Sequence, residues 1–296
     1  MKVLVTGGSG FVGREIVRQL LADGHAVRVL ARGTRAAVPG VETCRGSVLD
    51  PATLPFALAG CDAVIHLVGI ISEVGDQTYD RVHAEGTGHL LRAARAAGVA
   101  RFIHMSALGT RPQAASRYHR SKWEAEEQVR ASGLAWVIHR PSLVYGPGDG
   151  FVNLFAGLSR WSPVVPVIGH GRTLFQPVAV GDVARAFVAS LARETATGRT
   201  FDLCGPERLS FDQLVAEILA AAGRRRWTLH LPFALAHLQA TALEWVVGGL
   251  LRRPPPLNRD QVRMLREDNV GDPGPMEREL GVRPIAFREG IRQWLG

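Results

Sequence analysis

Two hydrophobic periodicities alternate along the first two thirds of the chain. Short runs of β-branched and other apolar residues predict strands at about residues 2–6, 26–31, 41–44, 61–68, 101–105 and 135–139. Apolar residues at helical spacing follow the first strand and also fill about 79–97 and 117–131. Strands that alternate with helices pair in parallel through right-handed crossovers. The pattern therefore predicts an α/β fold built on a doubly wound parallel sheet.

The alternation ends after about residue 148. Glycine and proline cluster at 146–150, and residues 176–180 resemble a strand that returns to the sheet before a helix at 183–192. We therefore expect the sheet domain to comprise residues 1–148 plus about 176–192. A smaller, mostly helical domain is expected to take about 149–175 and 193–296.

A glycine-rich turn joins the first strand to the first helix. Gly7 or Gly8 permits the tight turn, and Gly10 lets the backbone approach a pyrophosphate. Gly13 lets the helix pack closely on the strand, and the free N–H groups at the helix start face the phosphates. The pattern predicts a Rossmann-type dinucleotide site. The residues assigned to it are Gly7, Gly8, Ser9, Gly10, Phe11, Val12 and Gly13.

The end of the second strand selects the cofactor. An acidic residue there would bind a free ribose 2′-hydroxyl and favour NAD(H). The strand instead ends in Ala31 and Arg32. The guanidinium of Arg32 suits a 2′-phosphate, and Arg14 at the start of the first helix reaches towards the same group. We predict NADP(H) rather than NAD(H); the alternative is that Arg32 and Arg14 are ordinary surface arginines.

Tyr118 and Lys122 are four residues apart and share one face of a helix. An ammonium group beside a phenol favours the phenolate and lowers the pKa of the tyrosine towards a range useful for acid–base catalysis. Ser106 follows the fifth strand at the carboxyl edge of the sheet, where α/β folds bind ligands. Its hydroxyl is a candidate to hold a substrate carbonyl; the alternative is that Ser106 is an ordinary turn serine.

These motifs, together with the run Arg140-Pro141-Ser142-Leu143-Val144-Tyr145-Gly146-Pro147-Gly148, resemble the extended and atypical short-chain dehydrogenase/reductase superfamily, which includes NAD-dependent epimerases and dehydratases. The resemblance covers the chain to about residue 205. Residues 68–71, 82–87, 151–156, 176–178 and 261–270 are similar to a narrower group, the bacterial relatives of the nucleotide-binding accessory subunit of respiratory complex I, alpha-subcomplex subunit nine.

The resemblance implies roles for individual residues. Ser106, Tyr118 and Lys122 would be the catalytic serine, tyrosine and lysine, and Lys122 would also hold the nicotinamide ribose. Pro141 and Ser142 would border the nicotinamide. The cofactor would also contact Asp50, near the adenine, and Leu67, Val68 and Gly69.

Two of these positions have a second interpretation. Asp50 precedes a proline, and an Asp-Pro pair is also typical of the start of a helix. His83 stands where many superfamily members have an asparagine, so it is either a substitute in the proton relay or a packed histidine. Residues 107–117 contain no Asp or Glu, which disfavours the dehydration reaction of sugar-nucleotide dehydratases.

Composition and charge limit the classes of partner and site that we expect for this protein. The net charge is +8, but the arginines are scattered without an aromatic-rich basic stripe, so we expect no nucleic-acid partner. Cys44, Cys61 and Cys204 lie far apart and form no metal-type or redox-type pair. The first strand begins at residue 2 and leaves no room for a secretory segment. We expect no metal site and a cytoplasmic protein.

Residues 231–251 form an apolar stretch of membrane-spanning length. A carboxylate in the middle of a span costs about 2.5–3.5 kcal/mol, so Glu244 disfavours spanning. His237, Thr241, Glu244 and Gly248 share one stripe of the predicted helix and leave a broad apolar face. This face either packs in the core or makes a peripheral contact with a membrane surface or a protein complex.

Two functional hypotheses follow. The first is an NADP(H)-dependent oxidoreductase or epimerase that acts on a carbonyl or hydroxyl group of an unidentified small molecule, with Tyr118 as proton donor or acceptor. The second is a non-catalytic NADPH-binding accessory or assembly factor for a respiratory or quinone-linked membrane complex.

Overall fold

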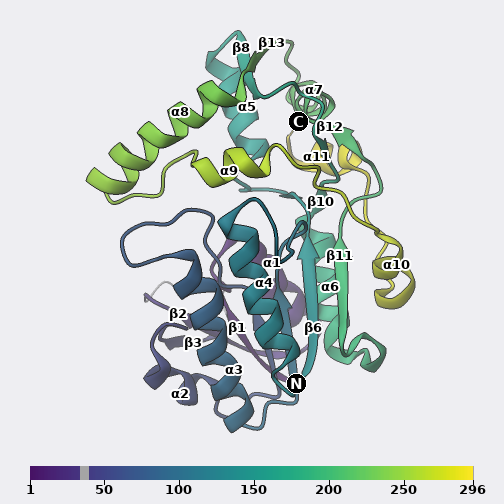
Figure 1. Cartoon of the computed structure of the whole chain (residues 1–296). Coiled ribbons are helices and arrows are strands. Elements are labelled where there is room, and N and C mark those ends of the chain that lie inside the picture. The colour runs from purple at the N-terminus through teal and green to yellow at the C-terminus, as the bar shows by residue number, and fades with distance from the viewer. Residues whose placement is uncertain (34–39, 296) are drawn as a thin grey trace.

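A seven-stranded parallel sheet forms the centre of the computed structural model, which describes residues 1–33 and 40–295 (Figure 1). The spatial order of its strands is β11-β6-β5-β4-β1-β2-β3. The strands are β1 (Lys2–Thr6), β2 (Ala26–Ala31), β3 (Glu42–Arg45), β4 (Ala63–His66), β5 (Arg101–Met105), β6 (Ala135–Pro141) and β11 (Arg199–Leu203). The predicted Rossmann-type α/β fold is confirmed.

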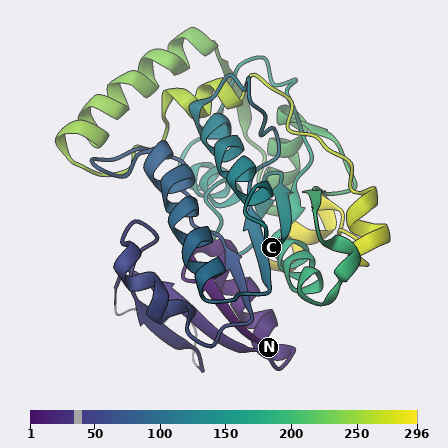
Figure 2. The ribbon, with the colours of Figure 1, turned by 60° about the horizontal axis from the view of Figure 1, so that its bottom comes forward.

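Helices cover both faces of this sheet, as Figures 1 and 2 show. Alternate side chains of β1 point to opposite faces: Val3 and Val5 join one buried cluster, and Leu4 joins the other. The first cluster is covered by α1 (Phe11–Ala22) and α6 (Val180–Ala192). The second is covered by α2 (Leu54–Leu58), α3 (Gly86–Ala96) and α4 (Arg117–Arg130), with short helical turns η1 (Pro51–Thr53) and η2 (Asp80–Glu85) before α2 and α3.

A second layer sits over one end of the sheet and has its own apolar core, which includes Phe155, Phe211 and Phe287. Its helices are α5 (Val152–Trp161), α7 (Phe211–Ala221), α8 (Phe233–Leu243), η4 (Glu244–Leu250), α9 (Arg259–Met264) and α11 (Phe287–Leu295). Its short strands are β8 (Val164–Ile168) paired with β13 (Trp227–Leu231), and β9 (Leu174–Phe175) paired with β12 (Leu209–Ser210).

Two details of the expected chain division need correction. The strand at 176–180 shortens to β10 (Val178–Ala179) and pairs with β7 (Val144–Tyr145) outside the main sheet. The seventh strand is instead β11, in the range assigned to the helical domain, and it pairs in parallel with β6. The turn η3 (Glu194–Ala196) leads into β11, and α10 (Gly274–Leu280) packs Met276 and Leu280 into the first sheet cluster. Residues 34–39 of the expected sheet domain lie outside the described residues.

The apolar stretch 231–251 does not pack into the core as a broad apolar face. Across α8 and η4, only Ala236 and Ala240 are buried, and they pack against Val262 of α9. Leu238 and Trp245 are 68% and 79% exposed. The core-packing interpretation is therefore wrong for this segment. None of the helices in residues 1–33 and 40–295 is long and apolar enough to cross a membrane.

Three histidines are buried in neighbouring strands of the sheet. His66, His104 and His139 lie in β4, β5 and β6 and are at most 1% exposed. Burial lowers the pKa of His66 and of His139 to about 3, and lowers that of His104 well below its usual range. Neither ring nitrogen of His104 has a hydrogen-bond partner among the described residues.

These histidines make the folded state sensitive to acid. Unfolding exposes rings that bind protons near pH 6.5, whereas the folded rings stay neutral, so stability is full above that pH and falls as the pH drops towards 3. Three protons give the free energy of unfolding a slope of about 4 kcal/mol per pH unit.

We expect His104→Met to reduce the pH dependence of the free energy of unfolding by the contribution of one proton. The substitution should also raise stability, because it removes two unpaired polar atoms. Urea unfolding at several pH values measures both. Exposed His170→Gln is the control, and a flat stability between pH 7 and 5 would contradict the expectation.

Candidate nucleotide and active site

The glycine turn adopts the predicted strand–turn–helix geometry. Gly7 has a φ of +74°, a conformation that favours glycine. A Cβ on Gly13 would lie 2.2 Å from the Gly7 carbonyl oxygen, so the start of α1 contacts the turn directly. Among the described residues no side chain caps α1, and the first turn of this helix holds no acidic residue. The N–H groups at this end are therefore available to an anion, which fits a pyrophosphate.

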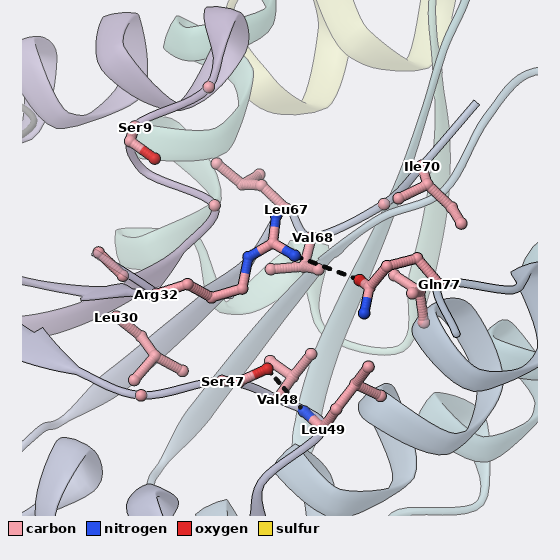
Figure 3. A pocket seen from close by; sticks show the side chains of 16 residues that line it. Ser9, Leu30, Arg32, Ser47, Val48, Leu49, Leu67, Val68, Ile70 and Gln77 are labelled. Atoms are coloured by element: carbon pink, nitrogen blue, oxygen red, sulfur yellow. Dashed lines mark hydrogen bonds between the residues drawn. The ribbon is translucent and has the colours of Figure 1, made fainter. Parts of the chain in front are cut away.

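A cavity of about 260 Å³ opens beside this turn (Figure 3). It lies at the carboxyl ends of β1, β2, β3 and β4, where a doubly wound sheet binds nucleotides. The predicted cofactor residues that line it are Gly7, Ser9, Gly10, Arg32, Leu67, Val68 and Gly69. The glycine turn and the uncapped helix beside this cavity fit the pyrophosphate of a dinucleotide.

The remaining residues of the glycine motif do not line this cavity. A Cβ on Gly8 would lie 2.9 Å from Val29 of β2, so the glycine at this position lets the turn pack closely against β2. Val12 packs against the first sheet cluster. A Cβ on Gly146 would lie 3.4 Å from the Phe11 ring, and Arg14 is exposed on α1. Only Arg32 of the two predicted phosphate-binding arginines therefore reaches the cavity.

A second hollow continues from this cavity past the end of β2. Arg32, Arg45, Ser47 and Asp50 line it. The Asp50 carboxylate also accepts a hydrogen bond from the Ala52 N–H at 3.3 Å and caps η1. Asp50 therefore starts a helical turn and also lines a hollow beside the predicted cofactor site. Two guanidinium groups at one hollow suit a phosphate. Arg45 was not predicted, because it is the last residue of β3 and comes close to Arg32 only through the pairing of β3 with β2.

Gln77 closes the opposite side of the cavity. Its side-chain oxygen accepts a hydrogen bond from Arg32 at 3.2 Å, as Figure 3 shows. Gln77 lies 45 positions further along the chain, in the segment that precedes η2. No local pattern marks it, so the sequence did not identify it.

Lys122 lies beside the inner end of the cavity. It is 2% exposed, and its ammonium group donates a hydrogen bond to the Met105 carbonyl at 3.0 Å. A Cβ on Gly69 would lie 3.1 Å from Lys122 Nζ. The ammonium group therefore sits between the ends of β4 and β5, next to a residue that lines the cavity. Burial lowers the pKa of Lys122 to about 8.

Tyr118 lies one helical turn before Lys122 on α4, and its ring packs edge-on against His83, with 5.4 Å between ring centroids. Burial raises the pKa of Tyr118 to about 12. This direction is opposite to the lowering that the Tyr118–Lys122 spacing suggested, because desolvation of the buried phenol disfavours its charged form. At neutral pH the tyrosine is therefore protonated.

His83 is held on both sides of its ring. Nε2 accepts a hydrogen bond from the Ile70 N–H at 3.0 Å, so the proton lies on Nδ1, 2.8 Å from Ser121 Oγ. The Ser121 hydroxyl donates in turn to the Tyr118 carbonyl at 2.8 Å. Burial lowers the pKa of His83 to about 2. This geometry favours the packed histidine over the relay, because both nitrogens are engaged.

Ser106 and Ser142 both form hydrogen bonds within the protein. The Ser106 hydroxyl is buried at the end of β5 and donates to Thr110 Oγ1 at 3.3 Å. The Ser142 hydroxyl donates to Asn269 Oδ1 at 2.6 Å and so ties β6 to the segment after α9. Pro141 accepts a hydrogen bond from the Leu108 N–H through its carbonyl. Neither Pro141 nor Ser142 lines the described cavity.

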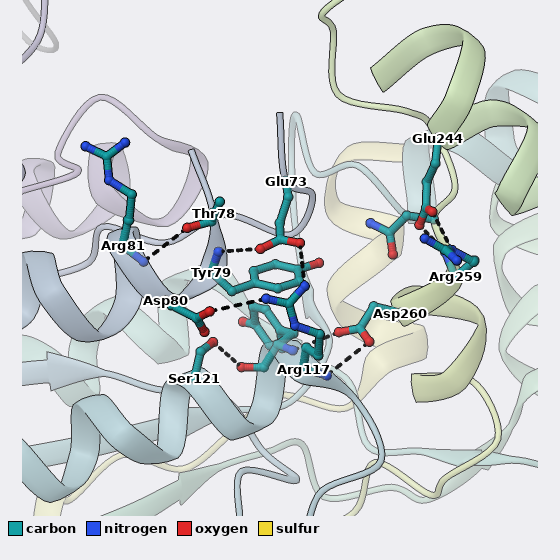
Figure 4. A network of polar contacts seen from close by, with 12 residues as sticks. Glu73, Thr78, Tyr79, Asp80, Arg81, Arg117, Ser121, Glu244, Arg259 and Asp260 are labelled. Carbon is teal, nitrogen blue, oxygen red and sulfur yellow. Dashed lines mark hydrogen bonds and ion pairs between the residues drawn. The ribbon is translucent and has the colours of Figure 1, made fainter. Parts of the chain in front are cut away.

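The start of α4 is anchored from the second layer (Figure 4). The Asp260 carboxylate of α9 accepts hydrogen bonds from the Arg117 N–H at 3.0 Å and the Tyr118 N–H at 2.7 Å. The Arg117 side chain forms ion pairs with Glu73 and Asp80 at 3.0 and 3.2 Å. Asp260 is thus a positioning residue for Tyr118. The sequence missed it because 142 positions separate the two residues.

Comparison with known proteins identifies relatives of this architecture. The model of the NAD dependent epimerase/dehydratase family matches residues 3–204. A 2-alkyl-3-oxoalkanoate reductase from Stenotrophomonas maltophilia is 29% identical and aligns over 99% of this chain and 98% of its own length. The mitochondrial NADH dehydrogenase [ubiquinone] 1 alpha subcomplex subunit 9 of Arabidopsis thaliana is 31% identical over 90% of this chain and 70% of its own.

A solved structure agrees in fold over the whole chain. It is that of a double mutant of DesIV, a dTDP-glucose 4,6-dehydratase from Streptomyces venezuelae, with NAD bound. The TM-score is 0.78 at 25% identity, and the match covers 100% of this chain and 96% of the other.

Proposed function

Because the chain belongs to the NAD dependent epimerase/dehydratase family, we propose that it is an NADP(H)-dependent oxidoreductase acting on a carbonyl or hydroxyl group. The observation that carries the proposal is the position of Lys122. Its buried ammonium group adjoins the nucleotide cavity at Gly69 and lies one helical turn from Tyr118. The similarity to the 2-alkyl-3-oxoalkanoate reductase from Stenotrophomonas maltophilia supports the reaction class.

Three side chains have separate roles in the proposed reduction of a carbonyl group. Tyr118 is protonated at neutral pH and donates its proton to the carbonyl oxygen. Lys122, with a pKa of about 8, is mostly charged at that pH and stabilises the phenolate that remains. Ser106, at the end of β5, polarises the carbonyl by turning its hydroxyl from Thr110. NADPH, when bound, would supply the hydride.

The activity is tested by oxidation of NADPH in the presence of carbonyl compounds. A 2-alkyl-3-oxoalkanoate belongs in this set, because the reductase from Stenotrophomonas maltophilia carries that name. We expect NADPH to be consumed with at least one member of the set. Tight NADPH binding without consumption by any of them would contradict the proposed activity.

Arg32 and Arg45 are expected to select NADPH over NADH. Arg32→Ala combined with Arg45→Ala should weaken NADPH binding about tenfold to hundredfold, because two charge-assisted hydrogen bonds to the 2′-phosphate are lost. NADH binding should change little. Fluorescence titration with both nucleotides measures these affinities. The control is Arg14→Ala, an arginine of α1 that lines neither hollow. Tighter binding of NADH than NADPH by the unaltered protein would contradict the choice of cofactor.

A second candidate is a non-catalytic NADPH-binding accessory or assembly factor for a respiratory or quinone-linked membrane complex. The 31% identity to a subunit named as part of NADH dehydrogenase supports it. The anchoring of Tyr118 from the second layer by Asp260 also suits a rigid nucleotide-holding protein. NADPH that copurifies with the protein, exchanges slowly and is not oxidised would favour this candidate.

A further inference from the structure

The segment 233–251, called the apolar arm from here on, consists of α8, η4 and Leu251. It projects from the second layer in both views of the ribbon (Figures 1 and 2). Its inner side carries small residues, Ala236 and Ala240, which are fully buried against α9. Its outer side carries large ones. An ordinary surface helix has the opposite arrangement, with its large apolar residues turned inwards.

The outer side of the arm is a continuous apolar stripe. Leu235, Leu238, Ala242 and Trp245 follow at intervals of three and four residues, so they share one helical face. Leu235, Leu238 and Trp245 are 51%, 68% and 79% exposed. Leu250 continues the apolar surface and is 76% exposed. Burial of this stripe against another apolar phase would be favourable.

Positive charge flanks the stripe and negative charge is nearly absent. Residues 224–259 contain six arginines and one carboxylate, Glu244. That carboxylate is already paired with Arg259 at 2.5 Å. Arg252 and Arg253 directly follow the arm and are exposed. The charge around the arm therefore complements an anionic surface.

We propose that the apolar arm docks the protein on the surface of an anionic phospholipid bilayer. The outer stripe enters the boundary between headgroups and acyl chains, where tryptophan is favoured, and Trp245 marks that depth. Arg252 and Arg253 meet the lipid phosphates. The arm lies along the surface and does not cross the membrane, in agreement with its length and with Glu244.

Cosedimentation of the full chain with vesicles tests this proposal. We expect binding to vesicles of phosphatidylcholine mixed with phosphatidylglycerol, and weaker binding to phosphatidylcholine alone or at high salt. Leu238→Gln combined with Trp245→Gln should weaken binding about tenfold or more, because two anchoring side chains are lost. Arg252→Gln combined with Arg253→Gln should remove most of the preference for the anionic lipid.

Matched controls come from the opposite end of the molecule. Phe56→Gln changes a side chain that is 72% exposed on α2, and Arg92→Gln combined with Arg95→Gln removes two charges from α3. These variants should bind vesicles like the unaltered protein. Nucleotide titration shows whether each variant is folded. Vesicles of brominated lipids provide a test that does not depend on loss of binding. These lipids should quench the tryptophan fluorescence of the unaltered protein more strongly than that of Trp245→Phe.

Three results would overturn the proposal. The first is unaltered protein that stays in the supernatant with every vesicle. The second is arm variants that sediment as the controls do. The third is a concentration-dependent dimer in the absence of vesicles that Leu238→Gln with Trp245→Gln dissociates, because the arm would then be covered by a second copy of the chain.

Discussion

Gly13→Ala is expected to abolish nucleotide binding and to destabilise the fold by about 3 kcal/mol. The added methyl group would lie 2.2 Å from the Gly7 carbonyl oxygen and 2.7 Å from Gly8 Cα. Both neighbours are backbone atoms, so no side chain can rotate away. The helix α1 must shift, and its N–H groups then leave the position from which they face a pyrophosphate. Thermal unfolding and NADPH titration measure the two effects.

The control for this substitution is Gly157→Ala, which also replaces a helical glycine. A Cβ at Gly157 in α5 would meet no atom of the residues that the structure describes within 4 Å. This variant should bind NADPH normally and gain up to about 1 kcal/mol of stability from better helix propensity. Normal NADPH affinity in Gly13→Ala would show that the contact between α1 and the turn is not needed for the nucleotide.

Tyr118→Phe is expected to lower the turnover of a carbonyl substrate by about 10²–10⁴-fold while leaving NADPH affinity unchanged. Phenylalanine keeps the packing against His83 and removes only the proton donor. Burial holds the hydroxyl in its protonated form, so its loss leaves the carbonyl oxygen without a proton at the moment of reduction. Steady-state kinetics and nucleotide titration separate these effects.

Tyr145→Phe is the matched control, because the Tyr145 hydroxyl is buried without a hydrogen-bond partner among the described residues. Its removal should leave turnover unchanged and stability unchanged or slightly higher. Equal turnover in Tyr118→Phe and the unaltered protein would exclude Tyr118 as the proton donor. The cofactor assignment would survive that result, since it rests on Arg32 and the glycine turn.

Several parts of the fold and site were predictable because they depend on neighbours in sequence. The glycine turn needs only a strand, a tight bend and a helix within 22 residues. Tyr118 and Lys122 share a helix face whatever surrounds the helix. Arg32 directly follows β2, so the parallel sheet alone brings it to the carboxyl edge.

Other parts required the tertiary structure. The pKa of Tyr118 depends on how much apolar material surrounds the phenol, and sequence spacing between Tyr118 and Lys122 carries no information about that burial. The exposure of Trp245 depends on whether another element covers the arm. The hydrophobic pattern there is consistent with a core helix and with a surface helix alike.

Local periodicity and backbone geometry were enough to predict the parallel α/β sheet, the dinucleotide turn and the Tyr118–Lys122 pair. The packing of distant segments was needed to show that Arg45 joins Arg32, that Asp260 anchors Tyr118 and that the apolar arm is exposed. These contacts join residues far apart in the chain. Their formation depends on how the whole sheet and second layer pack, which no local pattern encodes.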